Sequence, residues 1–157
     1  MQNDKEENEQ PVAITLVTKE DEPAIRRLLA GAGLEHEDFS AQLDHFLVAR
    51  RGGVVVGAVG LECEGGAGLL RSLVVAPDQQ RKGIGTRLCA EMVKCAWFEG
   101  VRQLYLLTAA AERFFTRQGF KREDRAAVPA SIAATRSFVG PIPDGVVCMK
   151  RQIDQLG

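Results

Sequence analysis

The sequence lacks the features that would assign it to a membrane, secreted or nucleic-acid-binding class. No apolar run approaches the roughly 18 residues that a membrane helix needs, and no basic segment followed by an apolar one forms a secretory signal, so a cytoplasmic location is expected. Its 20 Lys and Arg residues balance 21 Asp and Glu residues, which leaves no basic excess for nucleic acid or an anionic membrane. With 157 residues, 45% of them hydrophobic, the chain predicts a globular protein.

Patterns for metal binding and disulfide pairing are missing as well. His36 and His45 lie among acidic residues, but their spacing matches no ligand motif, so no metal is expected. The chain also contains no C-x-x-C pair. Reduced, mostly buried thiols are therefore predicted for its four cysteines: Cys63, Cys89, Cys95 and Cys148.

Hydrophobic periodicity predicts a mixture of strands and helices from Val12 onward. Residues 1–11 contain no apolar residue after Met1 and are expected to be a disordered leader, followed by a single domain over residues 12–157. Strands are predicted at residues 12–17, 46–50, 54–62, 69–75, 103–107 and 146–151, and helices at residues 18–31, 37–43, 83–98, 109–117 and 129–138. This order predicts an α+β (mixed α/β) fold with helices on both faces of the sheet and residues 69–75 as a central strand.

One strand-to-helix junction combines the features of an anion-binding site. Residues 73–86 read Leu-Val-Val-Ala-Pro-Asp-Gln-Gln-Arg-Lys-Gly-Ile-Gly-Thr. Gly83 and Gly85 leave the first helical turn without side chains, so its free N–H groups can approach a phosphate, while Arg81 and Lys82 add positive charge. Leu88 stands three residues after Gly85, and no Gly-Lys-Ser/Thr follows, so neither a dinucleotide fingerprint nor a P-loop fits.

The string Gln80-x-x-Gly83-x-Gly85, after a strand and Ala-Pro, resembles the pyrophosphate-binding motif of the GNAT superfamily of acetyl-CoA-dependent N-acetyltransferases. The helix, the next buried strand and the segment 114–120 follow in an order similar to that of the family, so the resemblance covers roughly residues 12–151. It implies a GNAT-like, mixed but mainly antiparallel central sheet with helices on both faces.

Two narrower resemblances concern the substrate. Residues 105–108, 114–115, 124–129 and 136–138 are similar to acetyltransferases associated with arsenic-resistance clusters, which in turn resemble the acetyltransferase domain of N-acetylglutamate synthases. Both groups imply a small amino-acid-like or acidic amine as the acceptor, a small-molecule partner rather than nucleic acid or a membrane. The first group often carries a cysteine just before the proline that matches Pro143, where this chain has Ile142, which weakens any arsenic role.

The resemblance implies an enzyme that uses acetyl-CoA as co-substrate, without a metal, and transfers the acetyl group by direct attack of an amine on the thioester. Many relatives carry a tyrosine acid where this chain has Phe115, which cannot donate a proton. A noncatalytic acyl-CoA-binding sensor or interaction module is therefore the alternative function. Tyr105, the only tyrosine, lies inside a predicted strand and is expected to pack rather than react. A homodimer remains open.

Cofactor residues are carried over from the family by position. The backbone of Leu73, Val74 and Val75 is expected to bond pantetheine as an added strand would. The pyrophosphate loop matches a run of six residues: Arg81, Lys82, Gly83, Ile84, Gly85 and Thr86. Thr108 is either a polar cofactor contact or the N-cap of the helix after it.

Charged residues of two neighbouring strands are candidates for the chemistry. Glu62 is the favoured base, directly or through a water, with Glu64 as its rival, and a solvated turn carboxylate remains an open interpretation of each. Arg71 interrupts an apolar strand and is predicted to bind a substrate carboxylate or oxyanion, with a salt bridge to Glu62 or Glu64 as the structural alternative. Arg125 and Arg136 are weaker candidates for substrate binding, by resemblance alone.

Overall fold

The computed structural model describes residues 10–34 and 45–154. The predicted helix at residues 37–43 and all but the last two residues of the predicted leader lie outside the described residues. Within the described ranges, no helix is both long enough and apolar enough to cross a membrane.

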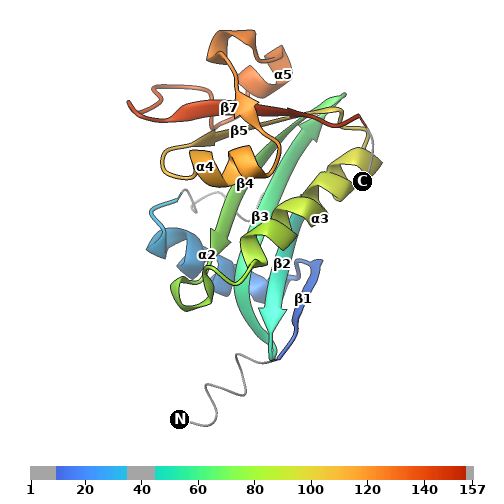
Figure 1. Cartoon of the computed structure of the whole chain (residues 1–157), viewed down its shortest axis with the longest axis vertical. Helices are drawn as coiled ribbons and strands as arrows, with labels where there is room; N and C mark the ends of the chain where they lie inside the picture. The colour runs from blue at the N-terminus through green and yellow to red at the C-terminus, as the bar shows by residue number, and fades with distance from the viewer. Residues whose placement is uncertain (1–9, 35–44, 155–157) are drawn as a thin grey trace. The chain divides into compact units, whose positions relative to one another are not determined.

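Apart from the short strand β6 and the 3-10 helices, the described residues form strands and helices in the order that the sequence predicts (Figure 1). The strands are β1 (Val12–Leu16), β2 (Phe46–Arg51), β3 (Val54–Glu64), β4 (Ala67–Val75), β5 (Gln103–Thr108), β6 (Lys121–Arg122) and β7 (Val147–Gln152). The α-helices are α2 (Glu22–Gly31), α3 (Ile84–Phe98), α4 (Glu112–Arg117) and α5 (Ala130–Ala133), with short 3-10 helices η1 (Lys19–Asp21), η3 (Pro77–Gln79) and η4 (Arg125–Ala127).

The strands are hydrogen-bonded in the order β1-β2-β3-β4-β5-β7-β6, which places β4 in the middle, as predicted. The pairs β1–β2, β2–β3, β5–β7 and β6–β7 are antiparallel, and β4–β5 is parallel. The predicted fold class, a mixed but mainly antiparallel sheet with helices, is confirmed.

The described chain forms two compact units, and β3 and β4 each contribute to both. The first holds the described residues up to Gly60 together with Ser72–Met92; the second holds Leu61–Arg71 and the described residues from Val93 onward. The extent of the single domain expected over residues 12–157 stays a prediction.

In the first unit, helices cover both faces of β3. Ile25 and Leu29, four residues apart on α2, are buried in a cluster that includes Ala58 of β3. A Cβ placed on the neighbouring Gly57 would lie 3.0 Å from Cδ1 of Leu88 on α3. Because successive residues of a strand point to opposite faces, α2 and α3 lie on opposite sides of β3 (Figure 1).

The second unit has its own core beneath the β4–β5 pair. Ile132 of α5 packs in a cluster with Leu69 and Tyr105, which are paired in the β4–β5 register. Phe115 of α4 is buried, with its ring edge-on to those of Phe114 and Phe120 at centroid distances of 5.1 and 5.7 Å. Aromatic edge contacts of this kind stabilise a core beyond their buried area.

Two predicted helices differ in their bounds, and one short strand is not predicted. The helix expected from Ala109 begins at Glu112, because the Thr108 hydroxyl accepts the Ala111 N–H at 3.0 Å and holds the intervening residues in a turn. The helix expected at residues 129–138 is only Ala130–Ala133; the Thr135 hydroxyl donates to the Ile132 carbonyl at 2.7 Å, at the end of this single turn. The two-residue strand β6 is too short to give a periodic signal and was not expected.

Candidate active site

The predicted pantetheine strand lies at the end of β4, in the first unit. Val74 is buried and Leu73 and Val75 are half-buried, as expected of side chains that fill the sheet. Ser72 before them has φ 58, a left-handed conformation that non-glycine residues seldom adopt. The parallel register of β4 with β5 covers Ala67–Leu69. The backbone thus changes conformation between the part of β4 in that register and Leu73, and such outliers are often found at ligand sites.

The loop between η3 and α3 has the backbone of an anion-binding turn. Arg81 has φ 66 and Gly83 has φ 83, so two residues near the start of α3 are left-handed. Alternation of left- and right-handed residues directs successive N–H groups into one concavity, which suits a phosphate. A Cβ on Gly83 would meet no atom within 4 Å, so the space beside this backbone is open.

Hydrogen bonds at its start hold this loop. The Gln80 amide Nε2 donates to the Val75 carbonyl at 3.1 Å, and the Ala76 N–H donates to the Val56 carbonyl at 2.8 Å. The buried Gln79 accepts from Nε of Arg51 at 3.1 Å. The first residue of the predicted motif therefore ties the end of β4 to the loop.

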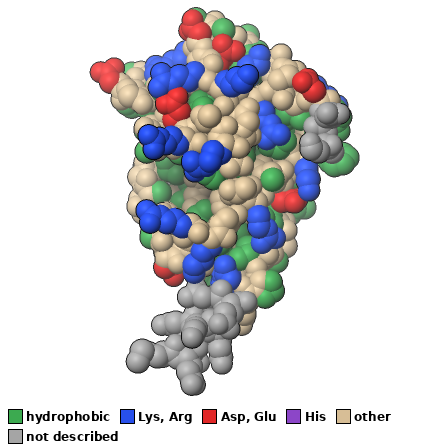
Figure 2. Space-filling view, in the orientation of Figure 1, with side chains coloured by type: hydrophobic (Ala, Val, Ile, Leu, Met, Phe, Trp, Pro, Cys, Tyr) green, Lys and Arg blue, Asp and Glu red, His purple; other side chains and the backbone are tan. Residues whose placement is uncertain are grey.

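Positive charge gathers around the loop. Arg81, Lys82, Thr86 and Arg87 are exposed, and Figure 2 shows several Lys and Arg side chains on the face that carries the start of α3. Arg87 Nη1 donates to the Val12 carbonyl at 2.9 Å. Open backbone, left-handed turns and exposed cations together fit the pyrophosphate of a coenzyme A ester.

Thr108 ends β5, in the second unit, and is half-buried. Its hydroxyl accepts a hydrogen bond from the Ala111 N–H, so Thr108 does bind the local backbone, as the alternative interpretation predicts. Thr108 is not the N-cap of α4, however, because that position is Ala111. A cofactor contact by Thr108 stays a prediction.

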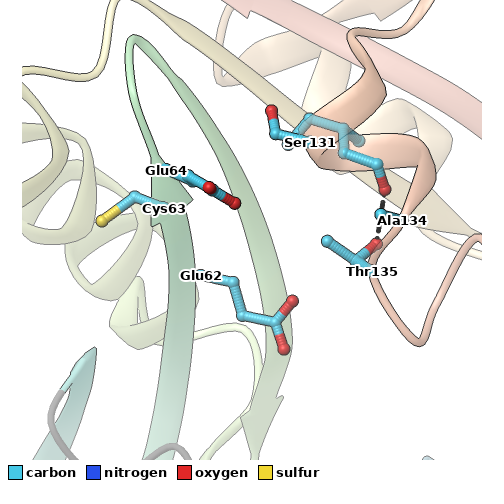
Figure 3. Close-up of a pocket in the computed structure, with 7 residues that line it drawn as sticks. Glu62, Cys63, Glu64, Ser131, Ala134 and Thr135 are labelled. Atoms are coloured by element: carbon cyan, nitrogen blue, oxygen red, sulfur yellow. Dashed lines mark hydrogen bonds between the residues drawn. The ribbon is translucent and has the colours of Figure 1, made fainter.

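A pocket of about 210 Å³ lies in the second unit (Figure 3). Its walls come from the end of β3 and from α5 with the residues just after it: Glu62, Cys63, Glu64, Ser131, Ile132, Ala134 and Thr135. The side chains of Glu62 and Glu64 extend toward the segment of Ser131 and Thr135, whereas that of Cys63 points away. The favoured base and its rival therefore line the same pocket.

Glu62 and Arg71 form an ion pair beside this pocket. Arg71 Nη1 lies 2.6 Å from Glu62 Oε1, and the two side chains are 10% and 22% exposed. The salt bridge that the sequence left as an alternative is thus present. Arg71 itself is not among the residues that line the pocket.

The two weaker arginine candidates also lie outside the pocket lining. Arg125 is exposed and donates from Nη2 to the Val146 carbonyl at 2.5 Å, a contact that fixes the chain before β7. Arg136 is exposed and follows Thr135. A substrate-binding role for either residue stays a prediction.

The aromatic residues behave as the sequence predicts. Tyr105 is 2% exposed, and burial raises the pKa of its hydroxyl, with a further contribution from Glu123. Phe115 is buried between other rings. Tyr105 therefore packs, and Phe115 offers no proton.

All four cysteines are free thiols, two buried (Cys89 and Cys148) and two half-buried (Cys63 and Cys95), so the expectation of mostly buried thiols holds for half of them. Burial raises the pKa of Cys148 to about 11, and burial also raises the pKa of Cys63. Among the described residues, no group of three His, Cys, Asp or Glu side chains could hold a metal ion, and His36 lies outside that part of the chain.

Sequence reasoning did not find the α5 side of the pocket. The sequence predicts Ser131, Ile132 and Thr135 only as part of a helix, and they are about seventy positions from Glu62 in the chain. No local pattern marks such a partner. Only the fold brings the two segments together.

The similarity to known proteins extends over much of the chain. Amino-acid acetyltransferases from Ectopseudomonas mendocina and Shewanella oneidensis are 25% identical over 104 residues and 30% identical over 95 residues. These matches cover 65% and 59% of this chain but 24% and 21% of the relatives, so the matched segment spans about a quarter or less of those proteins.

Solved structures share the fold. N-acetylglutamate synthase from Neisseria gonorrhoeae, complexed with coenzyme A and L-arginine, has a TM-score of 0.81 at 22% identity, covering 94% of this chain and 34% of that one. Rv2747 from Mycobacterium tuberculosis, in complex with CoA, has a TM-score of 0.79 at 21% identity, covering 90% of this chain and 99% of that one.

The family model described as acetyltransferase (GNAT) domain matches residues 42–122, just over half of the chain. Together these findings confirm the predicted GNAT acetyltransferase family and its fold. N-acetyl transfer with acetyl-CoA as co-substrate is a proposal for this chain. The narrower resemblance to acetyltransferases of arsenic-resistance clusters stays a prediction. The chain belongs to the acetyltransferase (GNAT) domain family.

Proposed function

We propose that the chain transfers the acetyl group of acetyl-CoA to the amine of a small amino-acid-like molecule. Two features support this proposal: the family of the chain, and relatives that are amino-acid acetyltransferases. A pocket of about 210 Å³ has room for a small acceptor rather than a folded protein.

The first unit would hold the coenzyme. Leu73–Val75 would bond pantetheine through their backbone, and Arg81–Thr86 would surround the pyrophosphate with N–H groups and cations. The single observation that carries this role is the pair of left-handed residues, Arg81 and Gly83, immediately before α3.

The second unit would hold the acceptor near Glu62. Bound acetyl-CoA supplies the thioester: the neutral amine forms a C–N bond to the acetyl carbonyl carbon while the C–S bond breaks. The sulfur leaves with the bonding electron pair and takes a proton from water. The proton lost by the amine passes to the Glu62 carboxylate, directly or through a water. Since an alkyl thiol such as that of cysteine has a pKa near 8.5, the thiolate of coenzyme A is an acceptable leaving group without a tyrosine acid.

A matched pair of glycine variants tests the coenzyme site. Gly83 (φ 83) and Gly53 of the β2–β3 turn (φ 80) both have positive φ and open space around a new Cβ. Alanine at either position should cost a similar 1–2 kcal/mol, roughly, of stability through backbone strain. Titration calorimetry with acetyl-CoA should show affinity at least about tenfold weaker for Gly83→Ala and little changed for Gly53→Ala. Equal affinities in the two folded variants would remove the proposed role of the loop.

Release of CoA thiol with a panel of amino acids and simple amines tests the transfer. Turnover with any member supports an enzyme. Tight acetyl-CoA binding without turnover across the panel would favour the noncatalytic sensor. Phe115 favours that alternative, because this buried ring cannot donate a proton.

A further inference from the structure

The charge of the pocket in the second unit bears on which acceptor it takes. Among the described residues, its lining contains two carboxylates, Glu62 and Glu64, and no Lys, Arg or His. An acidic acceptor would therefore meet like charge on the pocket wall, which is unfavourable in a partly desolvated site.

Glu62 has its counter-ion within the protein. Arg71, only 10% exposed, places Nη1 2.6 Å from Glu62 Oε1. Freeing Arg71 to bind a substrate carboxylate would leave Glu62 without this partner, at a cost typical of a broken, largely buried pair. The pair therefore contributes no net charge to the pocket.

Glu64 differs from Glu62 in this respect. It is the last residue of β3 and is exposed, and its side chain makes no hydrogen bond or ion pair with any residue in the described ranges 10–34 and 45–154. The net charge of the lining and Arg71 together is thus negative and is centred on Glu64. Arg136 is near in sequence but is not part of the lining.

The two glutamates lie on one wall in a way that suits two amino groups. Residues two apart on a strand share a face and are separated by roughly 6–7 Å. Figure 3 shows both side chains directed toward the segment of Ser131 and Thr135. Within that segment, Ile132 and Ala134 add apolar surface to the lining, against which a short aliphatic chain could lie.

From this arrangement we infer that the acceptor carries two amino groups: Glu64 binds one as an ammonium, and the other is presented to Glu62. The acceptor is then a basic amino acid or a small diamine rather than an acidic amino acid. This inference rests on the proposed function and makes Glu64 a specificity-determining residue.

Three amino acids of similar size test it: L-lysine, L-norleucine, which lacks the second amino group, and L-glutamate. The value of kcat/KM from CoA release should be highest for lysine, about three- to tenfold above norleucine, since a contact with an exposed carboxylate is modest. In Glu64→Gln the lysine-to-norleucine ratio should fall to within about twofold of one, mainly through a higher KM for lysine. Asp144→Asn removes a charge from an exposed position of the same unit and should keep the ratio.

The outcomes separate the two proposals. Acetylation of glutamate in preference to lysine, or an unchanged ratio in Glu64→Gln, overturns the inference while the acetyltransferase function stands. If no amine is turned over, calorimetry of lysine and norleucine against CoA-saturated protein still tests whether Glu64 binds a second amino group. Tighter binding of lysine that is lost in Glu64→Gln supports the inference, and equal binding of lysine and norleucine overturns it.

Discussion

At the scale of single residues, the Glu62–Arg71 contact changes how both side chains are interpreted. An arginine inside an apolar strand would be costly to bury alone, and here a carboxylate 2.6 Å away meets that requirement. We propose that Arg71 positions Glu62, and the substrate contact that the sequence predicts for Arg71 stays a prediction. Loss of Arg71 should then act on kcat more than on KM for the acceptor.

Glu62→Gln tests the base directly. Glutamine keeps an oxygen to accept from Arg71 Nη1 but cannot take a proton at neutral pH, so kcat should fall by about 10² to 10⁴ while the affinity for acetyl-CoA is retained. CoA release at pH 7 measures kcat, and the melting temperature shows that the variant is folded. Raising the pH supplies more neutral amine and should recover part of the activity. Full kcat at pH 7 would show that Glu62 is not the base.

At the scale of elements, α2 is attached to β2 by an ion pair at its start. Asp21, 4% exposed, accepts from Arg50 Nη1 at 2.7 Å and from Nη2. It also accepts the Thr18 N–H at 2.8 Å, which closes the turn before α2. The Asp21 side chain thus closes the 3-10 turn η1 and joins the start of α2 to the sheet.

Asp21→Asn should destabilise the fold by about 1–3 kcal/mol at pH 7. The Arg50 guanidinium is the main cause of the lowered pKa of Asp21. Since the folded pKa lies below the unfolded value near 3.9, the stabilisation is complete above about pH 5 and is lost as the pH falls through the folded pKa. Urea unfolding from pH 7 to pH 3 should show the difference between wild type and Asp21→Asn shrinking at the acid end. A difference independent of pH would mean that the ion pair is not its source.

The elements that sequence could predict are those with a long periodic signal. Most elements fall within a few residues of their predicted bounds: β1 to β5, β7, α2 and α3. In the two helices the signal is the repeat of apolar residues at helical spacing, such as Ile25 and Leu29 on α2 or Leu88 and Met92 on α3. α4 and α5 differ because a side-chain hydroxyl, of Thr108 or Thr135, takes a local backbone partner. Composition does not show which partner such a hydroxyl selects.

At the scale of the whole molecule, the part of the site that sequence could predict is the part encoded in one segment. The Gly83 loop and its strand are contiguous, so their order alone indicates an anion site. The pocket instead joins residues 62–64 to residues 131–135, and the Glu62–Arg71 pair joins two strands. Contacts between distant segments depend on packing, which no local pattern in a single sequence contains.

The buried thiols give a prediction for the stability of the whole chain at alkaline pH. Burial raises the pKa of Cys148 to about 11, above its unfolded value near 8.5. The unfolded state therefore loses this proton first, so the stabilisation is full below about pH 8.5 and declines as the pH rises toward 11, by at most about 1.4 kcal/mol per pH unit. The raised pKa values of Cys63 and Tyr105 act in the same direction.

Cys148→Ala isolates this contribution, because every other group that titrates is shared with the wild type. Alanine leaves a small cavity, so the variant should be less stable at pH 7.5, where the thiol is protonated in both states. Urea unfolding at pH 7.5, 9 and 10.5 should show the two free energies of unfolding converging, since only the wild type has the Cys148 proton to lose. Curves that stay parallel across this range would indicate that the Cys148 thiol is not held protonated by burial.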